Sequence, residues 1–184
     1  KGSYVAGKEE GIWESYFENG EINTKGRFVE GKMSGKWEVF YADGSRKTQT
    51  DYLNGVKNGT EILYDENGSI YQKADYKDGV MNGRWERYVD GVLIEKGAYV
   101  EGKKDGLWVF YAQNGYKQRE QEFKKGKPDG RWVEYFSANK KSAEGEYNEG
   151  QKSGTWMNYD KKGNVLSETV FKNGKKIKEE IKKK

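Results

Sequence analysis

Few residue types that support catalysis are present in this 184-residue chain, which contains no cysteine and no histidine. A thiolate nucleophile, an imidazole base and a zinc site built from thiolates are therefore excluded. Carboxylates recur at Glu14, Glu38 and Glu86, interleaved with Lys and Arg. Paired-carboxylate hydrolysis requires two such groups about 5–10 Å apart in a cleft. We expect solvated strand-face charges instead, and the sequence predicts no catalytic residue, no metal site and no cofactor.

The glycine-rich segment Gly31-Lys32-Met33-Ser34-Gly35 and its copies form a second candidate, a phosphate-binding loop. A phosphate-binding loop opens a helix, whereas these segments precede strand-like sequence, so we interpret them as turns. Lysines follow the first glycine of several copies, at Lys8, Lys32, Lys103, Lys127 and Lys175. An anion-binding row along this rim is a minor alternative, because it is interrupted at Val56, Val80 and Gln151.

Composition argues against both a conventional globule and disorder. Only 33% of the residues are hydrophobic, but 15% are aromatic and 35% are charged. One large two-layer core needs a higher apolar fraction, and disordered chains are poor in aromatic residues. The segment 172–184 holds seven Lys and two Glu, a charge of +5, which leaves −1 for the rest of the chain. A nearly neutral body predicts no nucleic-acid partner.

The chain is a tandem repeat of about 24 residues. Repeats open with an aromatic residue, at Tyr4, Phe28, Tyr52, Tyr76, Tyr99, Phe123, Tyr147 and Phe171. A glycine follows three residues later, and a second glycine, a Trp, a Tyr or Phe and a turn glycine come at fixed offsets. Glu61 replaces the Trp of the third copy, and Asn139 replaces the turn glycine of the sixth. Residues 4–174 thus hold seven repeats and a partial eighth.

Each repeat reads as a β-hairpin. Five Asn-Gly or Asp-Gly pairs predict type I′ turns with positive φ at both residues, at Asn19-Gly20, Asp43-Gly44, Asn67-Gly68, Asp90-Gly91 and Asn114-Gly115. Each pair of glycines such as Gly31 and Gly35 predicts a second turn, which starts the next hairpin. The connections are too short for parallel crossovers. We therefore expect an all-β fold, an elongated single-layer antiparallel meander of roughly fourteen to sixteen strands.

The recurring aromatic residues divide into two sets. One set is expected to stack with the repeat-opening rings as a structural ladder: Trp13, Trp37, Trp85, Trp108, Trp132 and Trp156. In strict strand alternation the other set faces the opposite side, as an exposed aromatic row that could bind a partner: Tyr16, Tyr64, Tyr88, Tyr111, Tyr135 and Tyr159. A bulge would instead put both sets on one face, and packing of both sets is the alternative.

The pattern Tyr-x-x-Gly-Lys-x-x-Gly-x-Trp-x-x-Tyr-x-x-Asn-Gly, as in residues 4–20 and 99–115, resembles the bacterial variant of the MORN repeat. The resemblance covers residues 4–174 and implies an open, elongated antiparallel sheet without enzymatic activity. It also implies a scaffold for protein–protein or lipid association. Many bacterial members carry an antitoxin label.

We therefore expect a non-enzymatic scaffold that binds another protein along its face. The alternatives are cell-surface binding of a glycan or choline-like ligand through aromatic rows, and association with a membrane surface or lipid. End-to-end self-association through the sheet edges also stays open. Export to a bacterial cell surface is expected from the start at Lys1 and the lack of cysteine, with the cytoplasm as the alternative. Residues 175–184 are expected to be a basic tail, with a short helix suggested by Ile177 and Ile181.

Overall fold

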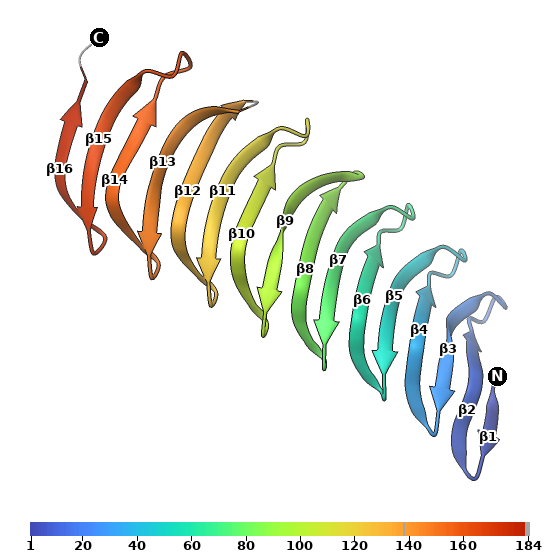
Figure 1. The fold of residues 1–184 in the computed structure, drawn as a ribbon. Coiled ribbons are helices and arrows are strands. Elements are labelled where there is room, and N and C mark those ends of the chain that lie inside the picture. The colour runs from blue at the N-terminus through green and yellow to red at the C-terminus, as the bar shows by residue number, and fades with distance from the viewer. Residues whose placement is uncertain (138, 183–184) are drawn as a thin grey trace. The chain divides into compact units, whose positions relative to one another are not determined.

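The computed structural model describes residues 1–137 and 139–182. All regular secondary structure in these ranges consists of β-strands. The strands follow one another in chain order and are joined by short turns (Figure 1). The predicted all-β antiparallel meander of hairpins is therefore confirmed, with 16 strands.

The chain divides into two compact units, Lys1–Gly91 and Val92–Lys184. The first unit contains β1 (Ser3–Val5), β2 (Lys8–Tyr16), β3 (Ile22–Val29), β4 (Lys32–Phe40), β5 (Arg46–Leu53), β6 (Val56–Tyr64), β7 (Ile70–Lys77) and β8 (Val80–Val89). The second contains β9 (Val92–Val100), β10 (Lys103–Tyr111), β11 (Lys117–Lys124), β12 (Lys127–Ser137), β13 (Lys140–Asn148), β14 (Gln151–Tyr159), β15 (Val165–Lys172) and β16 (Lys175–Ile181). Within each unit, consecutive strands pair antiparallel.

The first glycine of each repeat forms a tight turn, as predicted. Between β3 and β4, Val29 lies opposite Lys32, and the two residues between them, Glu30 and Gly31, have φ of 49° and 77°. Two consecutive positive φ values define the type I′ turn, whose twist matches that of the paired strands. The Gly31 N–H donates to the Glu9 carbonyl at 2.9 Å, and this bond ties the turn to the preceding hairpin.

The prediction of type I′ turns at the Asn-Gly and Asp-Gly pairs is wrong for four of the five pairs. At Asn19-Gly20 only Gly20 has positive φ, 88°. The Gly20 N–H donates to the Phe17 carbonyl at 3.0 Å, and the Phe17 N–H donates to Glu21 at 2.8 Å. This is a three-residue loop, a type I turn followed by a left-handed glycine. The other three pairs also have positive φ only at glycine: Asp43-Gly44, Asn67-Gly68 and Asn114-Gly115.

Asp90-Gly91 is the exception, with φ of 50° and 75°. This two-residue connection between β8 and β9 is one residue shorter than the loop at Asn19-Gly20, which explains why the repeat from Tyr76 to Tyr99 has 23 residues instead of 24. Asn139, which replaces the turn glycine of the sixth repeat, has the left-handed φ of 61° that its residue type predicts.

The second glycine of each repeat lies inside a strand and not in the turn, which corrects our expectation for Gly35. Arg27 lies opposite Ser34 and Lys25 lies opposite Glu38, so Gly35 falls in a bulge of β4, with φ of 70°. Residues 35–37 of β4 thus face the single residue Gly26 of β3, and the two extra residues bend the strand locally. In three later repeats a carboxylate of the facing strand accepts the N–H that follows the bulge glycine: Asp51 from Thr60, Asp75 from Arg84 and Glu122 from Arg131.

The expected C-terminal helix is also wrong. Lys175–Ile181 forms β16, and Val170 of β15 lies opposite Lys178. The i, i+4 spacing of Ile177 and Ile181 misled the sequence reading because residues four apart share a face in a strand as well as in a helix.

Candidate interaction surface

The sheet has two chemically different faces. The Tyr16 hydroxyl donates to the Glu14 carboxylate at 2.6 Å, so Tyr16 lies on the same face as Glu14. Successive side chains of a strand alternate, so Trp13 faces the other way. We call these the tyrosine face and the ladder face.

Edge-to-face ring contacts run along the ladder face. In the first unit Tyr4, Trp13, Phe28 and Trp37 follow one another with centroid separations of 5.1, 5.7 and 4.9 Å. In the second unit Trp108 contacts Tyr99 and Phe123, and Trp156 contacts Tyr147 and Phe171, at 5.2–6.1 Å. The ring centroids of Trp132 and Trp156 are also 4.9 Å apart, but these rings are tilted by 34° and not edge-to-face. Trp85, Trp108 and Trp156 are buried. Such pairs stabilise the sheet by roughly 0.5–1.5 kcal/mol beyond the area they bury.

Four glycines support the indole rings, and sequence reasoning missed their role. A Cβ atom added at any of them would lie 2.1–2.3 Å from the nearest ring atom of the facing Trp. None of them has positive φ, so close approach and not backbone conformation requires glycine there. The four pairs are Gly2 with Trp13, Gly26 with Trp37, Gly97 with Trp108 and Gly145 with Trp156. Their common position, two residues before the repeat-opening aromatic, was the signal available in the sequence.

Three repeats lack this glycine: Ala74 faces Trp85 and Gln121 faces Trp132, whereas the third repeat changes both partners of the pair. Where Glu61 replaces Trp, Thr50 replaces the glycine, and the Thr50 hydroxyl donates to the Glu61 carboxylate at 3.3 Å. Both residues are buried, and Lys57 forms an ion pair with Glu61. In the third repeat, a polar contact between Thr50 and Glu61 therefore replaces the contact of an indole ring with a glycine.

Lysines of the chain cover two of the indole rings. The Lys104 ammonium lies 3.7 Å from the Trp108 ring centroid, and the Lys152 ammonium lies 3.9 Å from that of Trp156. Lys104 also pairs with the buried Glu95 at 2.9 Å. A cation over an indole face is the arrangement that binds quaternary amines, and here the chain supplies the cation itself.

On the tyrosine face, the predicted tyrosine row is embedded in a lattice of Glu and Lys. Hydroxyl groups donate to carboxylates at 2.5–2.8 Å, in the pairs Tyr16–Glu14, Tyr88–Glu86, Tyr135–Glu120 and Tyr159–Glu144. Ammonium groups lie 5.3–5.7 Å from ring centroids, in the pairs Lys73–Tyr88, Lys96–Tyr111 and Lys117–Tyr135. Tyr16 is 46% exposed, whereas the other five tyrosines, Tyr64 among them, are half-buried.

Burial and hydrogen bonding shift the ionisation of this lattice. Burial raises the pKa of Tyr135 to about 12, and its hydrogen bond to Glu120 acts in the same direction. The same two causes raise the pKa of Tyr88 and of Tyr159 to about 12. Burial opposes ionisation of Glu120, but hydrogen bonds from Lys117 and Tyr135 outweigh it and lower the pKa. The hydroxyls of Tyr88, Tyr135 and Tyr159 therefore stay protonated donors at neutral pH, and Glu120 stays a charged acceptor.

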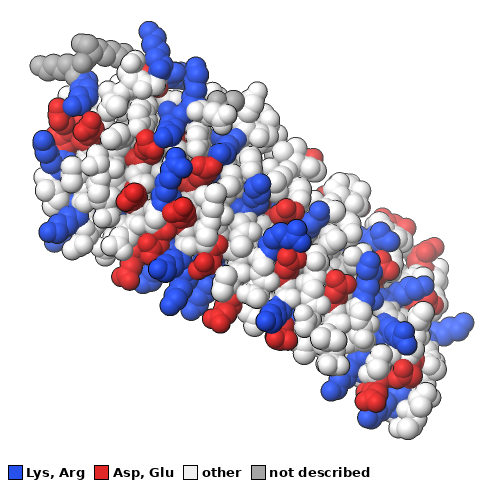
Figure 2. Space-filling view, in the orientation of Figure 1, with Lys and Arg blue, Asp and Glu red and all other residues white. Residues whose placement is uncertain are grey.

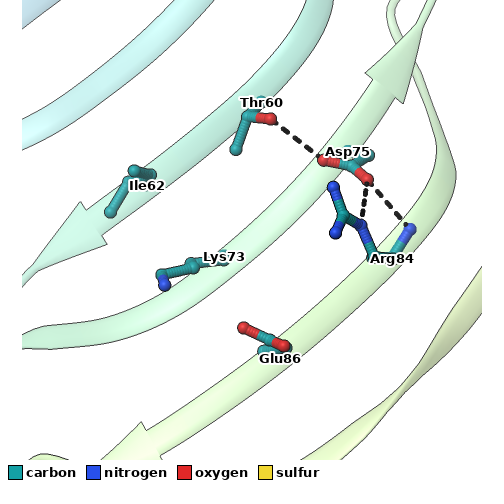
Figure 3. Close-up of a pocket in the computed structure, with 6 residues that line it drawn as sticks. All are labelled: Thr60, Ile62, Lys73, Asp75, Arg84 and Glu86. Carbon is teal, nitrogen blue, oxygen red and sulfur yellow. Dashed lines mark hydrogen bonds and ion pairs between the residues drawn. The ribbon is translucent and has the colours of Figure 1, made fainter.

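The main hollow on this face is open to solvent, and its carboxylate Asp75 is hydrogen-bonded to other residues of the lining. The hollow has a volume of about 360 Å³, belongs to the first unit and is lined by Thr60, Ile62, Lys73, Asp75, Arg84 and Glu86 (Figure 3). Asp75 accepts from the Thr60 hydroxyl at 3.0 Å and from the Arg84 backbone N–H at 3.1 Å. Because both Asp75 oxygens are engaged, its carboxylate caps the bulge and is not a free base. Figure 2 shows basic and acidic side chains interleaved over the visible face.

The described ranges contain no cluster of three or more His, Cys, Asp or Glu suited to a metal ion. They also contain no helix long and apolar enough to cross a membrane.

Comparison with known proteins identifies the repeat in part of the chain. The sequence model of the MORN repeat variant matches residues 9–30, 57–78 and 152–173. These matches fall on β2–β3, β6–β7 and β14–β15, hairpins with the long loop between their strands. No curated protein matches the chain. Three of its hairpins are thus similar to the MORN repeat variant, a non-catalytic repeat that is generally found in protein or membrane association.

Proposed function

We propose that the chain is a non-enzymatic repeat scaffold that binds another protein through its tyrosine face. The observation that carries the proposal is the lattice of Tyr hydroxyls on Glu carboxylates, with Lys ammonium groups over the rings. Tyrosine is enriched at protein interfaces, and a ring that is already held in place loses little entropy on binding. The lattice recurs from hairpin to hairpin, which suits an extended partner surface.

Two further features support a binding role over catalysis. The hollow around Asp75 is open, and its carboxylate is occupied by the bulge that it caps. Choline-like ligands are not favoured, because Lys104 and Lys152 already cover the indole faces of Trp108 and Trp156.

Affinity capture with matched variants tests the proposal. The immobilised chain is compared with the double variant Tyr135→Ala/Tyr159→Ala and with the control Tyr116→Ala, which removes a 50%-exposed tyrosine from a loop of the same unit. We expect one protein from an extract of the source organism to bind the wild type and the control, and to bind the double variant at least about tenfold more weakly. The interaction is then measured with both proteins purified.

Retention of that protein by the double variant, with an unchanged β-sheet circular dichroism spectrum, would overturn a role for the tyrosine face. Absence of any protein above background would overturn the scaffold function itself.

A further inference from the structure

One side-chain cluster on the ladder face does not repeat. Phe110 of β10, Arg119 of β11 and Glu134 of β12 lie opposite one another on three neighbouring strands. They line a hollow of about 600 Å³ together with Gln118, Phe136, Ser142 and Tyr135, the last of which also belongs to the tyrosine row. We call this the Arg119 hollow.

The repeat itself does not require these residue types. The positions equivalent to Arg119 are Thr24, Thr48, Gln72, Glu95, Ala143 and Ser167, with no second cation. The positions equivalent to Phe110 are Ser15, Val39, Leu63, Arg87, Glu134 and Asn158, with no second aromatic ring. Since the same strands form without this pair, the pair is specific to one place in the chain.

Arg119 is held in a geometry suited to a carboxylate. Its guanidinium carbon lies 4.1 Å from the Phe110 ring centroid. A guanidinium stacked on a ring keeps its N–H donors in one plane, where a carboxylate can accept two of them. The Nε atom is buried and has no hydrogen-bond partner among the described residues. A buried charged donor without an acceptor is unfavourable, and because the Nε atom has almost no exposed surface, a ligand carboxylate satisfies it only by shifting the neighbouring side chains.

Glu134 does not supply that acceptor. It lies opposite Arg119 in the strand register, but among the described residues no ion pair joins the two side chains, and Glu134 is exposed. The hollow therefore presents a guanidinium that has no ion-pair partner among the described residues, beside an apolar surface formed by Phe110 and by Phe136, which is 45% exposed.

We propose that the Arg119 hollow binds an acidic side chain of a partner protein, with an apolar side chain next to it packing on Phe136. This site rests on the proposed scaffold function and extends it to the ladder face. Charge complementarity supports an acidic partner, because Arg119 has no ion-pair partner among the described residues and residues 92–171 hold 14 Lys and Arg against 12 Asp and Glu, with five further surplus positive charges in 172–184.

Nuclear magnetic resonance with two short peptides tests the proposal on the full chain. The Arg119 Nε–H resonance is followed during titration with acetyl-Phe-Glu-Phe-amide and with its neutral counterpart acetyl-Phe-Gln-Phe-amide. We expect saturable shifts with the Glu peptide and binding at least about tenfold weaker with the Gln peptide.

Substitutions at Arg119 and at Glu134 are expected to change the affinity for the Glu peptide in opposite directions. Arg119→Gln abolishes binding of the Glu peptide, and Arg119→Lys weakens it, since an ammonium lacks the planar pair of donors. Glu134→Gln tightens binding roughly threefold, because it removes a neighbouring negative charge. Arg84→Gln makes the same charge change on an 87%-exposed side chain of the first unit, and it leaves binding unchanged.

The proposal is overturned by equal affinity for the two peptides, by an absence of saturable shifts, or by undiminished binding to Arg119→Gln. Vesicles of phosphatidylserine that shift the Arg119 resonance when the Glu peptide does not would assign the hollow to a lipid headgroup instead. Absence of Glu-peptide binding, while capture is still weakened by Tyr159→Ala, which lies outside the hollow, would overturn the Arg119 site and leave the scaffold function standing.

Discussion

The indole ring of Trp108 lies directly on the backbone of Gly97, so closely that a Cβ atom at Gly97 would be 2.3 Å from two ring atoms. Its Nε1–H donates to the Ala98 carbonyl at 3.2 Å. Trp108 is fully buried, although the only described strands that pair with its own strand are its two neighbours, β9 and β11. A large ring on a residue without a side chain is thus the packing unit of four repeats, while Trp85 and Trp132 face Ala74 and Gln121.

The Gly97–Trp108 contact predicts a large effect of one methyl group. Gly97→Ala is expected to lower the free energy of unfolding by about 2 kcal/mol, because the Cβ atom forces the indole off the strand. Urea denaturation measures the change. In the Trp108→Ala background the same Gly97→Ala substitution should be neutral or stabilising by about 0.5 kcal/mol. Equal losses in both backgrounds would show that the ring contact is not the cause.

The third repeat has Thr50 and Glu61 in place of the Gly–Trp pair, so the pair can be introduced there by mutation. Glu61→Trp alone is expected to destabilise the protein, since Thr50 occupies the surface on which the ring must lie. Thr50→Gly combined with Glu61→Trp should recover the loss and exceed the wild type by about 1 kcal/mol. Thermal and urea unfolding of the two single variants and the double variant measure the coupling. A purely additive result would contradict the proposed support role of glycine.

The hydrogen bonds between carboxylates and the bulge N–H groups predict how substitution of a carboxylate changes the free energy of unfolding. Asp75→Ala leaves the Arg84 N–H and the Thr60 hydroxyl without their acceptor, and it is expected to cost about 1–2 kcal/mol. Glu66→Ala, in an exposed loop of the same unit, is the control and should change stability by less than about 0.5 kcal/mol. Equal effects at the two positions would rule out the capping role.

The tyrosine face predicts a loss of stability at high pH. Burial and the hydrogen bond to Glu120 raise the pKa of Tyr135 to about 12, above its ordinary value of 10.0. The folded state therefore retains a proton that the unfolded state loses, so stability is fully present below pH 10 and falls as pH rises towards 12. Tyr135→Phe should make the decline between these pH values shallower. Ultraviolet titration of phenolate and urea unfolding at each pH measure both effects, and an unchanged slope in Tyr135→Phe would contradict the assignment.

Much of the fold follows from local patterns in the sequence. The spacing of the repeat-opening aromatics and the short connections require consecutive antiparallel hairpins, because no parallel crossover fits. The left-handed turn at Asn139 follows from its residue type alone. The loops at Asn19 and at Asp90 could not be told apart by the dipeptide, because Asn-Gly suits both a two-residue turn and the end of a three-residue loop.

The candidate sites depend on contacts between strands, and these were decided only in three dimensions. The sequence named Tyr135 and Trp108, but it did not show that a Glu of the neighbouring strand accepts from one or that a glycine lies beneath the other. The stacking of Arg119 on Phe110 in place of an ion pair with Glu134 depends on register and rotamer together. Repetition along the chain determines which strands are neighbours, whereas the side-chain partner of each residue is determined by the bulges that shift one strand against the next.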